Sequence, residues 1–291
     1  MPLILDGKKA RDSYKSRLIE RVGALSCTPT LALVQIGDNR ESTIYIEQKK
    51  KFGQTIGAHT EHIHLPENAT ENSISSRILA LNRRDDVHGI IIQLPLPAHL
   101  DRLSLINLID PEKDVDGLTD ENQRLLEEGT PRHIPATAKG VSLLLDFYGI
   151  SPAGKKAVVF GRSRLVGHPA AKLLEMKGAD VSVCHSKTED PEKISKTANI
   201  LVVAVGKPGL IGARHVKEGA VVIDVGINSV SGAKLEEEIP KRKIVGDVDF
   251  EAVQSLASAI SPVPGGVGPM TVLSLFDNLI SSAEKSCPRQ R

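Results

Sequence analysis

Residues 157–167 read Ala-Val-Val-Phe-Gly-Arg-Ser-Arg-Leu-Val-Gly, an apolar run of strand length followed by a turn between two glycines. Pro169 comes shortly afterwards, where proline suits the first turn of a helix. A glycine turn between a strand and a helix is typical of dinucleotide-binding domains, because the helix N-terminus presents N–H groups to a pyrophosphate. Ser163 stands where the usual fingerprint has a second glycine, so the flanking strand and helix carry most of this interpretation.

Further apolar runs of strand length follow this turn, with helix-length segments between them. They cover residues 180–184, 200–204, 220–224 and 244–245. A repeat of strand, turn and helix at this spacing predicts a parallel sheet with helices on its faces. We therefore expect residues 141–271 to form a Rossmann-like domain that binds a dinucleotide.

The end of the second strand of this series indicates which dinucleotide binds. An Asp or Glu there would bind the free ribose hydroxyl of NAD. The sequence instead has Cys-His-Ser-Lys at 184–187, with Arg162 in the glycine turn. Hydroxyl and cationic donors accommodate a ribose phosphate, so we predict NADP rather than NAD as the cofactor. Glu189 and Asp190 lie slightly farther along the chain and are the argument for NAD.

The first half of the chain alternates in the same way. Apolar runs predict strands at 30–37, 58–65 and 87–94. Helical periodicity or length predicts helices at 8–23, 39–57 and 71–82. This alternation predicts a second parallel sheet with covered faces, in which ligands bind beyond the carboxyl ends of the strands.

The predicted fold class is therefore α/β, with two α/β domains. The N-terminal parallel-sheet catalytic domain is expected to comprise residues 1–140 plus 272–291, and the Rossmann-like domain residues 141–271. A C-terminal helix over 272–283 is expected to return to the first domain. The tail at 286–291 is expected to be disordered.

The helix predicted over 39–57 places a lysine where a buried side chain is expected. Its candidate caps are Ser42 or Asp38 at the start and Gly57 at the end. At about 100° per residue, one narrow face carries Tyr45, Lys49, Phe52 and Ile56. Loss of solvation on that face would lower the pKa of Lys49 toward the range useful in proton transfer. The alternative is that Lys49 lies at the edge of the stripe, in a solvated run with Lys50 and Lys51.

Two other polar positions stand close to predicted strand ends or turns. Gln93 ends an otherwise apolar run, so it is either a satisfied core amide or a group aimed into a cleft, and its place at the strand end favours the cleft. Asp114 and Asp116 have one residue between them. They fit turn chemistry, a metal site with too few ligands, or a carboxylate that accepts bonds from paired N–H donors of a ligand. Composition does not choose among these.

Residues 261–271 read Ser-Pro-Val-Pro-Gly-Gly-Val-Gly-Pro-Met-Thr, which is dense in proline and glycine. A linker is usually polar and flexible, whereas this stretch is stiff and apolar. It predicts backbone shaped closely against a ligand.

Composition excludes several classes of protein. The formal net charge is +1 and the chain has no Trp, which disfavours a nucleic-acid surface. No apolar run has membrane-spanning length, and the start lacks a signal-peptide pattern. Cys27, Cys184 and Cys287 are few, scattered and odd in number, which favours a reducing cytoplasm over a disulfide framework. No Cys/His group has zinc spacing, and His62 and His64 are expected on a solvent face, so no metal is expected.

The motifs that carry a family resemblance occur in order along the chain. They are Tyr45-x-x-x-Lys49, Gln93-Leu-Pro-Leu-Pro97, Lys113-Asp-Val-Asp-Gly117, Gly161-Arg-Ser-Arg-Leu-Val-Gly-His-Pro169, Asp224-Val-Gly-Ile-Asn228, Val245-Gly-Asp247 and Pro262-Val-Pro-Gly-Gly-Val-Gly-Pro-Met-Thr271. Over nearly its whole length the chain resembles the bifunctional methylenetetrahydrofolate dehydrogenase/methenyltetrahydrofolate cyclohydrolases. One departure is at residues 134–140, Ile-Pro-Ala-Thr-Ala-Lys-Gly, where the family usually has Pro-Cys-Thr-Pro-x-Gly. Thr137 keeps its place.

The resemblance implies two reactions in one cleft between the domains. Methylenetetrahydrofolate gives a hydride to NADP and becomes the methenyl cation, and water then opens that ring to the formyl compound. It also implies a cytoplasmic homodimer that acts on tetrahydrofolate derivatives in one-carbon metabolism, serving purine, methionine and histidine biosynthesis. The alternatives are a dehydrogenase that has lost the cyclohydrolase activity and a non-catalytic NADP-binding sensor.

The resemblance also implies roles for individual residues. Lys49 is expected to be catalytic, Gln93 to hydrogen-bond it, and Tyr45 to stack on the folate ring system and help hold Lys49. Asp116 is expected to accept bonds from the amino and ring N–H groups of the pterin. The remaining substrate-binding positions implied are Pro264, Gly265 and Gly266. The implied NADP contacts are Gly161, Arg162, Ser163, Ser186, Ile227 and Thr137.

Overall fold

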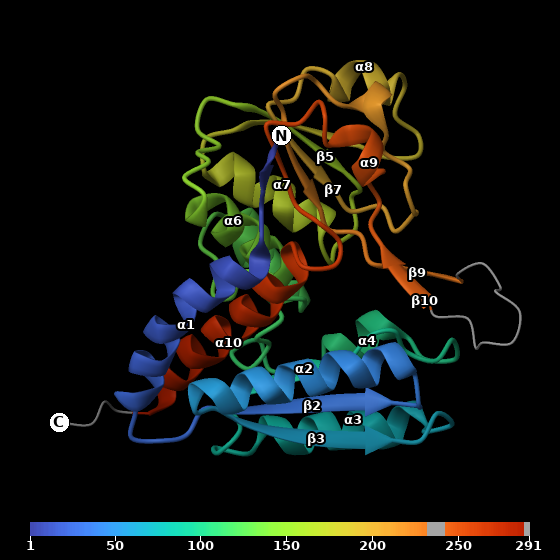
Figure 1. Ribbon diagram of the computed structural model, residues 1–291. Coiled ribbons are helices and arrows are strands. Elements are labelled where there is room, and N and C mark those ends of the chain that lie inside the picture. The colour runs from blue at the N-terminus through green and yellow to red at the C-terminus, as the bar shows by residue number, and fades with distance from the viewer. Residues whose placement is uncertain (232–241, 288–291) are drawn as a thin grey trace, which may run out of the picture. The chain divides into compact units, whose positions relative to one another are not determined.

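The chain enters each of its two structural units twice. A computed structural model describes residues 1–231 and 242–287 (Figure 1). One unit, called here the six-stranded unit, comprises Met1–Arg11 and Thr137–Thr271. The other, called the three-stranded unit, comprises Asp12–Ala136 and Val272–Arg291.

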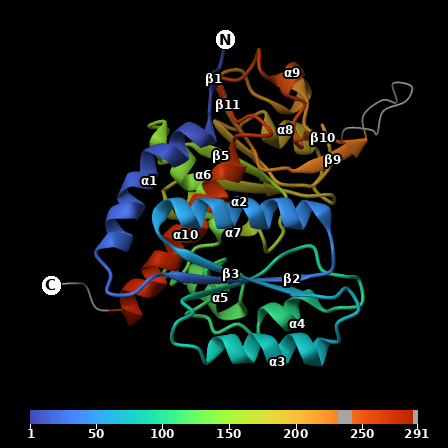
Figure 2. The ribbon, with the colours of Figure 1, turned by 60° about the horizontal axis from the view of Figure 1, so that its bottom comes forward.

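The three-stranded unit is built on a parallel sheet in which the first strand is central. The order is β3-β2-β4, with β2 at Thr30–Ile36, β3 at His59–Leu65 and β4 at Gly89–Ile92. Every residue of β2 is buried, as expected for a central strand covered on both faces. Helix α2 (Arg40–Ile56) covers one face, and α3 (Glu71–Asn82) lies on the other (Figure 2).

Further helices complete this unit. They are α4 (Arg102–Ile106), α5 (Asp120–Glu127) and most of α1 (Gly7–Gly23) and α10 (Val267–Ser286). The predicted return of the C-terminal helix is confirmed, because the Asn278 amide donates to the carbonyl oxygens of Val115 at 2.9 Å and Ile134 at 2.8 Å. Helix α10 is longer than expected at both ends.

The six-stranded unit has one wholly parallel sheet in the order β1-β11-β8-β7-β5-β6. Its strands are β1 (Leu3–Ile4), β5 (Lys156–Phe160), β6 (Asp180–Cys184), β7 (Ile200–Val203), β8 (Val221–Asp224) and β11 (Ala259–Ile260). The chain leaves β5 for β6 on one side and resumes with β7 on the other. This reversal makes the crevice between β5 and β7 the expected ligand position of a doubly wound sheet.

The helices of this unit are α6 (Ala136–Phe147), α7 (Gly167–Met176), α8 (Pro191–Ser195), the 3₁₀ turn η1 (Ala213–His215) and α9 (Phe250–Val253). Of these, α7 packs on β5 and β6. The core beneath them is apolar and closely buried, with Val158, Leu201 and Val222 at its centre.

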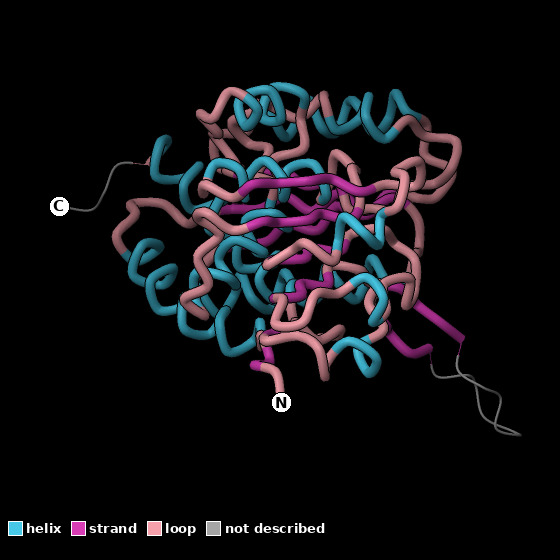
Figure 3. The backbone as a smooth tube through the Cα atoms, turned by 90° about the horizontal axis from the view of Figure 1, so that it is seen from above, coloured by secondary structure: helices cyan, strands magenta, loops and turns pink. Residues whose placement is uncertain are grey.

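The expected domain boundary differs from the structural division at the N-terminus. Residues 1–11 belong to the six-stranded unit, because β1 pairs with β11. The strand expected at 244–245 also lies outside the parallel sheet. It is β10 (Arg242–Val245), which pairs antiparallel with β9 (Asn228–Ser231), and the two strands stand apart from the main sheet (Figure 3). A two-residue run had too little pattern to distinguish these pairings.

The expectation of unpaired cysteines was wrong, because Cys27 and Cys287 form a disulfide. Their sequence separation is 260, so nothing in the local spacing signalled that the fold brings them together. The predicted disorder of the tail was also wrong for Ser286, which ends α10, and for Cys287, while 288–291 lie outside the described residues. Cys184 is free and buried. Within residues 1–231 and 242–287, no helix has the length and apolar character needed to cross a membrane.

Candidate active site

Helix α2 begins one residue from where the sequence suggested. Asn39 is its N-cap and accepts a 2.9 Å bond from the Ser42 N–H through its side-chain oxygen. The expected caps Ser42 and Asp38 were therefore wrong, because the Asn39 side chain reaches the N–H of Ser42, the third residue of the helix, which has no partner within the helix. The predicted stop was correct. Gly57 adopts φ 83°, a left-handed conformation that favours glycine and turns the chain into β3.

Lys49 lies at the edge of the buried stripe of α2 rather than at its centre. The buried positions of the helix are Ser42, Ile46, Phe52, Gly53 and Ile56. Tyr45 and Lys49 are half-buried on the flank of this stripe. The lysine run nevertheless divides, because Lys50 pairs with Glu47 on the surface and Lys51 is exposed. Lys49 thus does not behave as part of a solvated run.

The Lys49 ammonium donates a 2.8 Å hydrogen bond to Oε1 of Gln93. Gln93 is 8% exposed and directly follows β4. Its Nε2 donates to the Leu94 carbonyl oxygen at 2.8 Å, and its backbone N–H donates to the Val34 carbonyl oxygen at 2.8 Å. The amide is therefore fixed with its oxygen toward Lys49. Gln93 is thus a buried, satisfied amide at the strand end that also binds Lys49, and its place in a cleft stays a prediction.

Burial shifts the acid–base properties of the two charged groups at this site. Desolvation lowers the pKa of Lys49, and the nearby Asp116 carboxylate acts in the opposite direction. Desolvation raises the pKa of Asp116 to about 6, against the attraction of Lys49. The two groups thus have pKa values closer together than an ordinary aspartate and lysine, which suits a site where protons move near neutral pH.

The two aspartates of the Asp-Val-Asp motif do different things. The Asp114 carboxylate is buried and accepts from the N–H groups of Gly117 at 2.9 Å and Thr119 at 2.7 Å, and from the Asn122 amide at 2.9 Å. It therefore provides the turn chemistry. The Asp116 carboxylate accepts no hydrogen bond from any residue in the described part of the chain. Its acceptor capacity is consequently available to a ligand.

Tyr45 lies one helical turn before Lys49, and its phenol is half-buried. Desolvation, with a smaller contribution from the Glu41 carboxylate, raises the pKa of Tyr45. The phenol is thus neutral at physiological pH, and its ring offers an apolar face beside the lysine.

In the six-stranded unit, the turn after β5 is narrow because two glycines approach other backbone atoms. A Cβ on Gly161, whose φ is +108°, would lie 2.2 Å from the Ala204 carbonyl oxygen after β7. A Cβ on Gly167 would lie 2.2 Å from the Gly161 carbonyl oxygen. Ser163 replaces the missing glycine with a functional hydroxyl, since its Oγ accepts from the Val166 N–H at 3.3 Å. The predicted strand, turn and helix are confirmed.

The other residues expected at the dinucleotide lie on the same unit. Arg162 and Ser163 are exposed on the turn after β5, and Ser186 is exposed after β6. Ile227 is 50% exposed after β8, so its side chain is accessible, and its role as a cofactor contact stays a prediction. Thr137 lies in the first turn of α6, which begins at Ala136.

The proline- and glycine-rich stretch at residues 261–271 packs closely against the N-terminal segment of the chain at Gly7. The Gly265 carbonyl oxygen accepts from the Gly7 N–H at 2.8 Å. A Cβ on Gly7 would lie 1.7 Å from the Gly266 carbonyl oxygen. Gly266 is buried, whereas Pro264 is exposed and Gly265 half-buried. The peptide bonds before Pro95 and Pro264 are cis.

Sequence comparisons agree with this geometry. The catalytic domain of tetrahydrofolate dehydrogenase/cyclohydrolase matches residues 5–116, and the NAD(P)-binding domain of the same enzymes matches residues 135–287. The chain belongs to the tetrahydrofolate dehydrogenase/cyclohydrolase family. It is therefore an enzyme of one-carbon metabolism with dehydrogenase and cyclohydrolase activities.

Relatives of the tetrahydrofolate dehydrogenase/cyclohydrolase family match this chain over nearly its whole length. A bifunctional protein FolD from Lysinibacillus sphaericus is 44% identical, covering 97% of this chain and 97% of the relative. The crystal structure of the bifunctional enzyme FolD from Campylobacter jejuni has a TM-score of 0.90 at 41% identity, covering 98% of this chain and 99% of that one. The Trypanosoma brucei enzyme, complexed with NADP cofactor and inhibitor, has a TM-score of 0.92 at 35% identity, covering 98% of each chain.

Within the dehydrogenase/cyclohydrolase fold, sequence reasoning assigned no role to one buried carboxylate. Asp247 is fully buried and accepts from the N–H groups of Val205, Gly206 and Lys207 at 2.7, 2.9 and 2.8 Å. It also accepts from the Asn228 amide at 2.8 Å. It thus holds the loop after β7, which borders the crevice between β5 and β7. The Val-Gly-Asp motif marks Asp247 as a candidate functional residue. The motif does not indicate that three backbone N–H groups of another loop donate hydrogen bonds to its carboxylate.

A second buried carboxylate supports Asp247 from β8. Asp224 accepts from the N–H groups of Gly226 at 2.9 Å, Asp247 at 3.0 Å and Val248 at 2.9 Å. Desolvation raises the pKa of Asp224 to about 6, because it outweighs the N–H donors and acts with the nearby Asp247 charge. The pair fixes the segments after β7 and β8 relative to one another.

Proposed function

We propose that this chain oxidises 5,10-methylenetetrahydrofolate to the 5,10-methenyl compound with NADP, then hydrolyses the product to 10-formyltetrahydrofolate with Lys49 moving the protons. The observation that carries the proposal is the Lys49 ammonium held by a fixed Gln93 amide, with the Asp116 carboxylate nearby. In the hydrolysis, water adds to the methenyl carbon, which requires a proton to leave the water and then move on the adduct. A lysine of lowered pKa is a suitable base and acid for these transfers.

The other residues near Lys49 position it and the substrate. Gln93 orients the amine through its Oε1 and disfavours an alternative rotamer. Tyr45 offers a ring face on which the pterin stacks. The Asp116 carboxylate accepts the paired N–H donors of the pterin, which fixes the orientation of the substrate. Pro264, Gly265 and Gly266 are proposed as further substrate contacts.

The dehydrogenase step needs little acid–base help, because the folate nitrogens stabilise the developing cation. When bound, NADP supplies the hydride acceptor, and correct placement is most of what the protein contributes. The turn after β5 fits the phosphates of the cofactor, since the N–H groups of Arg162 and Ser163 donate to no other residue in the described ranges. Gly161, Ser186, Ile227 and Thr137 complete the proposed contacts.

We propose NADP rather than NAD because Arg162 and Ser186 are exposed at the ends of β5 and β6, where the ribose phosphate would lie. Ser186→Asp should therefore lower kcat/KM for NADP about tenfold, because an added carboxylate repels the phosphate and removes a hydroxyl donor. Steady-state rates with each cofactor at low concentration measure this effect. Ser182→Asp, an exposed position within β6, is the matched control. Equal loss in both variants, or no loss in Ser186→Asp, would contradict the assignment.

Asp116→Asn should move the rise of cyclohydrolase rate with pH to lower pH. The reason is that the Asp116 carboxylate raises the pKa of Lys49, so its removal lets desolvation lower that pKa further. More of the neutral amine is then present at a given pH. The same variant should raise KM for the folate substrate, since one pair of acceptors is lost. An unchanged pH profile would show that Asp116 does not act on Lys49, and a rise displaced to higher pH would contradict the sign of its effect.

Several coarser assignments complete the proposal. Of the proposed folate contacts, Lys49 and Asp116 belong to the three-stranded unit and residues 264–266 to the six-stranded unit. NADP is proposed to bind through the six-stranded unit. A cytoplasmic homodimer is carried over from the family, and sedimentation of the purified protein tests the dimer. No nucleic-acid partner is proposed, because the formal net charge is only +1 and the chain has no Trp, and no membrane partner, because no apolar run has membrane-spanning length. One assay with methylenetetrahydrofolate and NADP, following methenyl and formyl products together, tests the function: lasting accumulation of the methenyl compound would contradict the second activity.

A further inference from the structure

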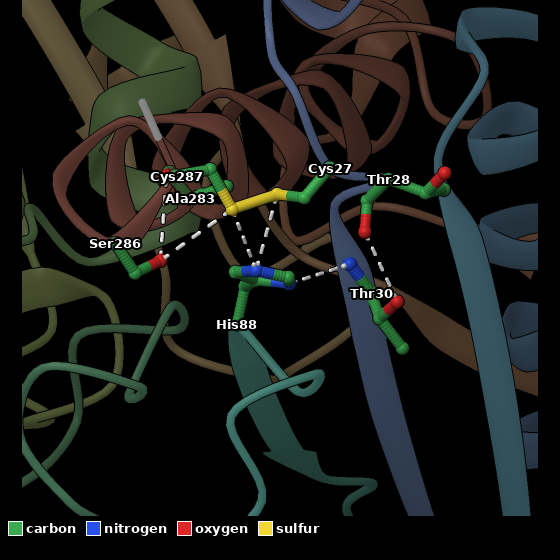
Figure 4. The surroundings of a disulfide bond; sticks show 7 residues. All are labelled: Cys27, Thr28, Thr30, His88, Ala283, Ser286 and Cys287. Atoms are coloured by element: carbon green, nitrogen blue, oxygen red, sulfur yellow. Dashed lines mark hydrogen bonds between the residues drawn. A yellow bond between two sulfur atoms is a disulfide. The ribbon is translucent and has the colours of Figure 1, made fainter. Parts of the chain in front are cut away.

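Three residues far apart in the sequence meet where β2 and β4 begin, in the three-stranded unit. Cys27 precedes β2, His88 precedes β4 and Cys287 follows α10. The two cysteines form a disulfide, and the His88 ring lies directly beside it (Figure 4). Nε2 of His88 is 3.4 Å from Sγ of Cys27 and 3.3 Å from Sγ of Cys287.

The proton on the His88 ring can be placed from its other nitrogen. The backbone N–H of Thr30 donates to Nδ1 of His88 at 3.1 Å, and a backbone N–H can only donate. Nδ1 is therefore unprotonated, and the neutral ring carries its proton on Nε2, between the two sulfurs. The ring is 4% exposed, and desolvation, with the Lys113 ammonium, lowers the pKa of His88, while the Asp86 carboxylate opposes them. The ring thus stays neutral and keeps its Nε2–H donor.

We propose that the Cys27–Cys287 bond is a thiol–disulfide exchange site that reacts with low-molecular-weight thiols, and that the Nε2–H of His88 stabilises the thiolate released from it. Both cysteine residues are half-buried, and the proposal requires that a small thiol reach one of their sulfurs, whereas His88 is buried. Enclosure matters because a hydrogen bond to a charged sulfur is stronger where water does not compete.

The exchange balances with a dithiol as the reductant. One thiolate of the reagent attacks one protein sulfur, the protein S–S bond breaks, and the other protein sulfur leaves as a thiolate that accepts the His88 hydrogen bond. The second thiol of the reagent, as its thiolate, then attacks the mixed disulfide and releases the remaining cysteine. The reagent ends as a cyclic disulfide, and two electrons have passed to the protein. The cysteine beside the Nε2–H of His88 is favoured as a thiolate, and the other cysteine takes a proton from solvent. His88 donates a hydrogen bond throughout and loses no proton.

A metal site is the competing interpretation, since two cysteine sulfurs and Nε2 of His88 lie within 4.8 Å of one another. A metal at Nε2 needs a lone pair there, and the ring proton would then belong on Nδ1. The N–H of Thr30 occupies the direction of that proton. The hydrogen bond from Thr30 therefore favours exchange over metal binding.

The state of this bond should affect thermal stability. It joins the segment before β2 to the end of α10, and the linked residues are 260 apart in sequence. Releasing such a long closed loop frees the unfolded chain, so reduction should lower Tm by about 5–10 °C. Gln93 lies at the other end of β4 from His88, so the Lys49–Gln93 contact does not depend on the disulfide.

The test is the rate of reduction by dithiothreitol, followed by alkylation and mass measurement. His88→Asn is the informative variant, because an asparagine oxygen can replace Nδ1 as acceptor for Thr30 while no donor reaches the sulfurs. We expect reduction about tenfold slower than in the unaltered protein. The exposed His99→Asn is the matched control and should leave the rate unchanged. An unchanged rate in His88→Asn would overturn the role of His88.

Two measurements on the unaltered protein keep the proposal testable if His88→Asn does not fold. In the reduced protein, the pH dependence of alkylation should show one cysteine with a pKa below the ordinary thiol value of about 8.5. Two ordinary thiols would overturn the proposal. Incubation of the reduced protein with zinc should give no stoichiometric binding, whereas one tightly bound zinc per chain would replace the exchange site with a metal site.

Discussion

Replacing Lys49 with methionine should lower the cyclohydrolase rate about 10³-fold, within the range of general acid–base catalysis by a positioned side chain. Methionine keeps the length and apolar character of the lysine stem, so α2 should stay packed on its sheet. The loss comes from the amine itself, which is held 2.8 Å from Gln93 and partly desolvated. The measurement is hydrolysis of the methenyl compound supplied directly.

The same variant should bind NADP as tightly as the unaltered enzyme, because the turn after β5 belongs to the six-stranded unit. Lys50→Met is the matched control, since Lys50 lies one residue away and forms an ion pair with Glu47 on the surface. That control should keep both activities. Full cyclohydrolase activity in Lys49→Met would remove the lysine from its proposed role. Loss of NADP binding as well would show that the substitution disturbs the fold rather than the chemistry.

Sequence pattern gave most of the secondary structure because hydrophobic periodicity is a local signal. The strand at 180–184 and the helix at 71–82 have the predicted bounds. The sequence also indicated the polar site. A lysine within an apolar helix stripe and a glutamine at the end of an apolar strand both depart from the local hydrophobic pattern. The contact between Lys49 and Gln93 depends on the order of the strands in the sheet. The alternation of strands and helices along the chain made that order predictable.

Features that depend on distant pairing were not predictable in this way. The two residues of β1 join a strand more than 250 positions away, at Ala259–Ile260, and carry too little pattern to indicate it. The Cys27–Cys287 disulfide was not predictable for the same reason, because it joins residues 260 apart in sequence. Asp247 is a third case, since its environment consists of backbone N–H groups whose positions follow from the completed fold. Sequence can mark such a carboxylate as unusual, but its partners are a property of tertiary structure.

Asp247→Ala should lower the free energy of unfolding by about 3–5 kcal/mol, because it leaves several buried N–H donors without an acceptor. Val205, Gly206 and Lys207 donate to this one carboxylate, and the loop that they form borders the proposed cofactor crevice. We therefore also expect a weaker dehydrogenase, with KM for NADP raised about tenfold. Denaturant unfolding and steady-state kinetics measure the two effects separately.

Asp249→Ala provides the comparison, because Asp249 is an exposed carboxylate in the same segment that caps α9 through one bond from the Ala252 N–H at 3.2 Å. Loss of one cap of this kind costs about 1 kcal/mol. Asp247→Asn should fall between the two, since its remaining oxygen accepts some of the same donors. If Asp247→Ala destabilised the protein no more than Asp249→Ala, the three donors would have other acceptors, and Asp247 would not be what holds the loop after β7. A large loss of stability with an unchanged KM for NADP would instead separate that loop from cofactor binding.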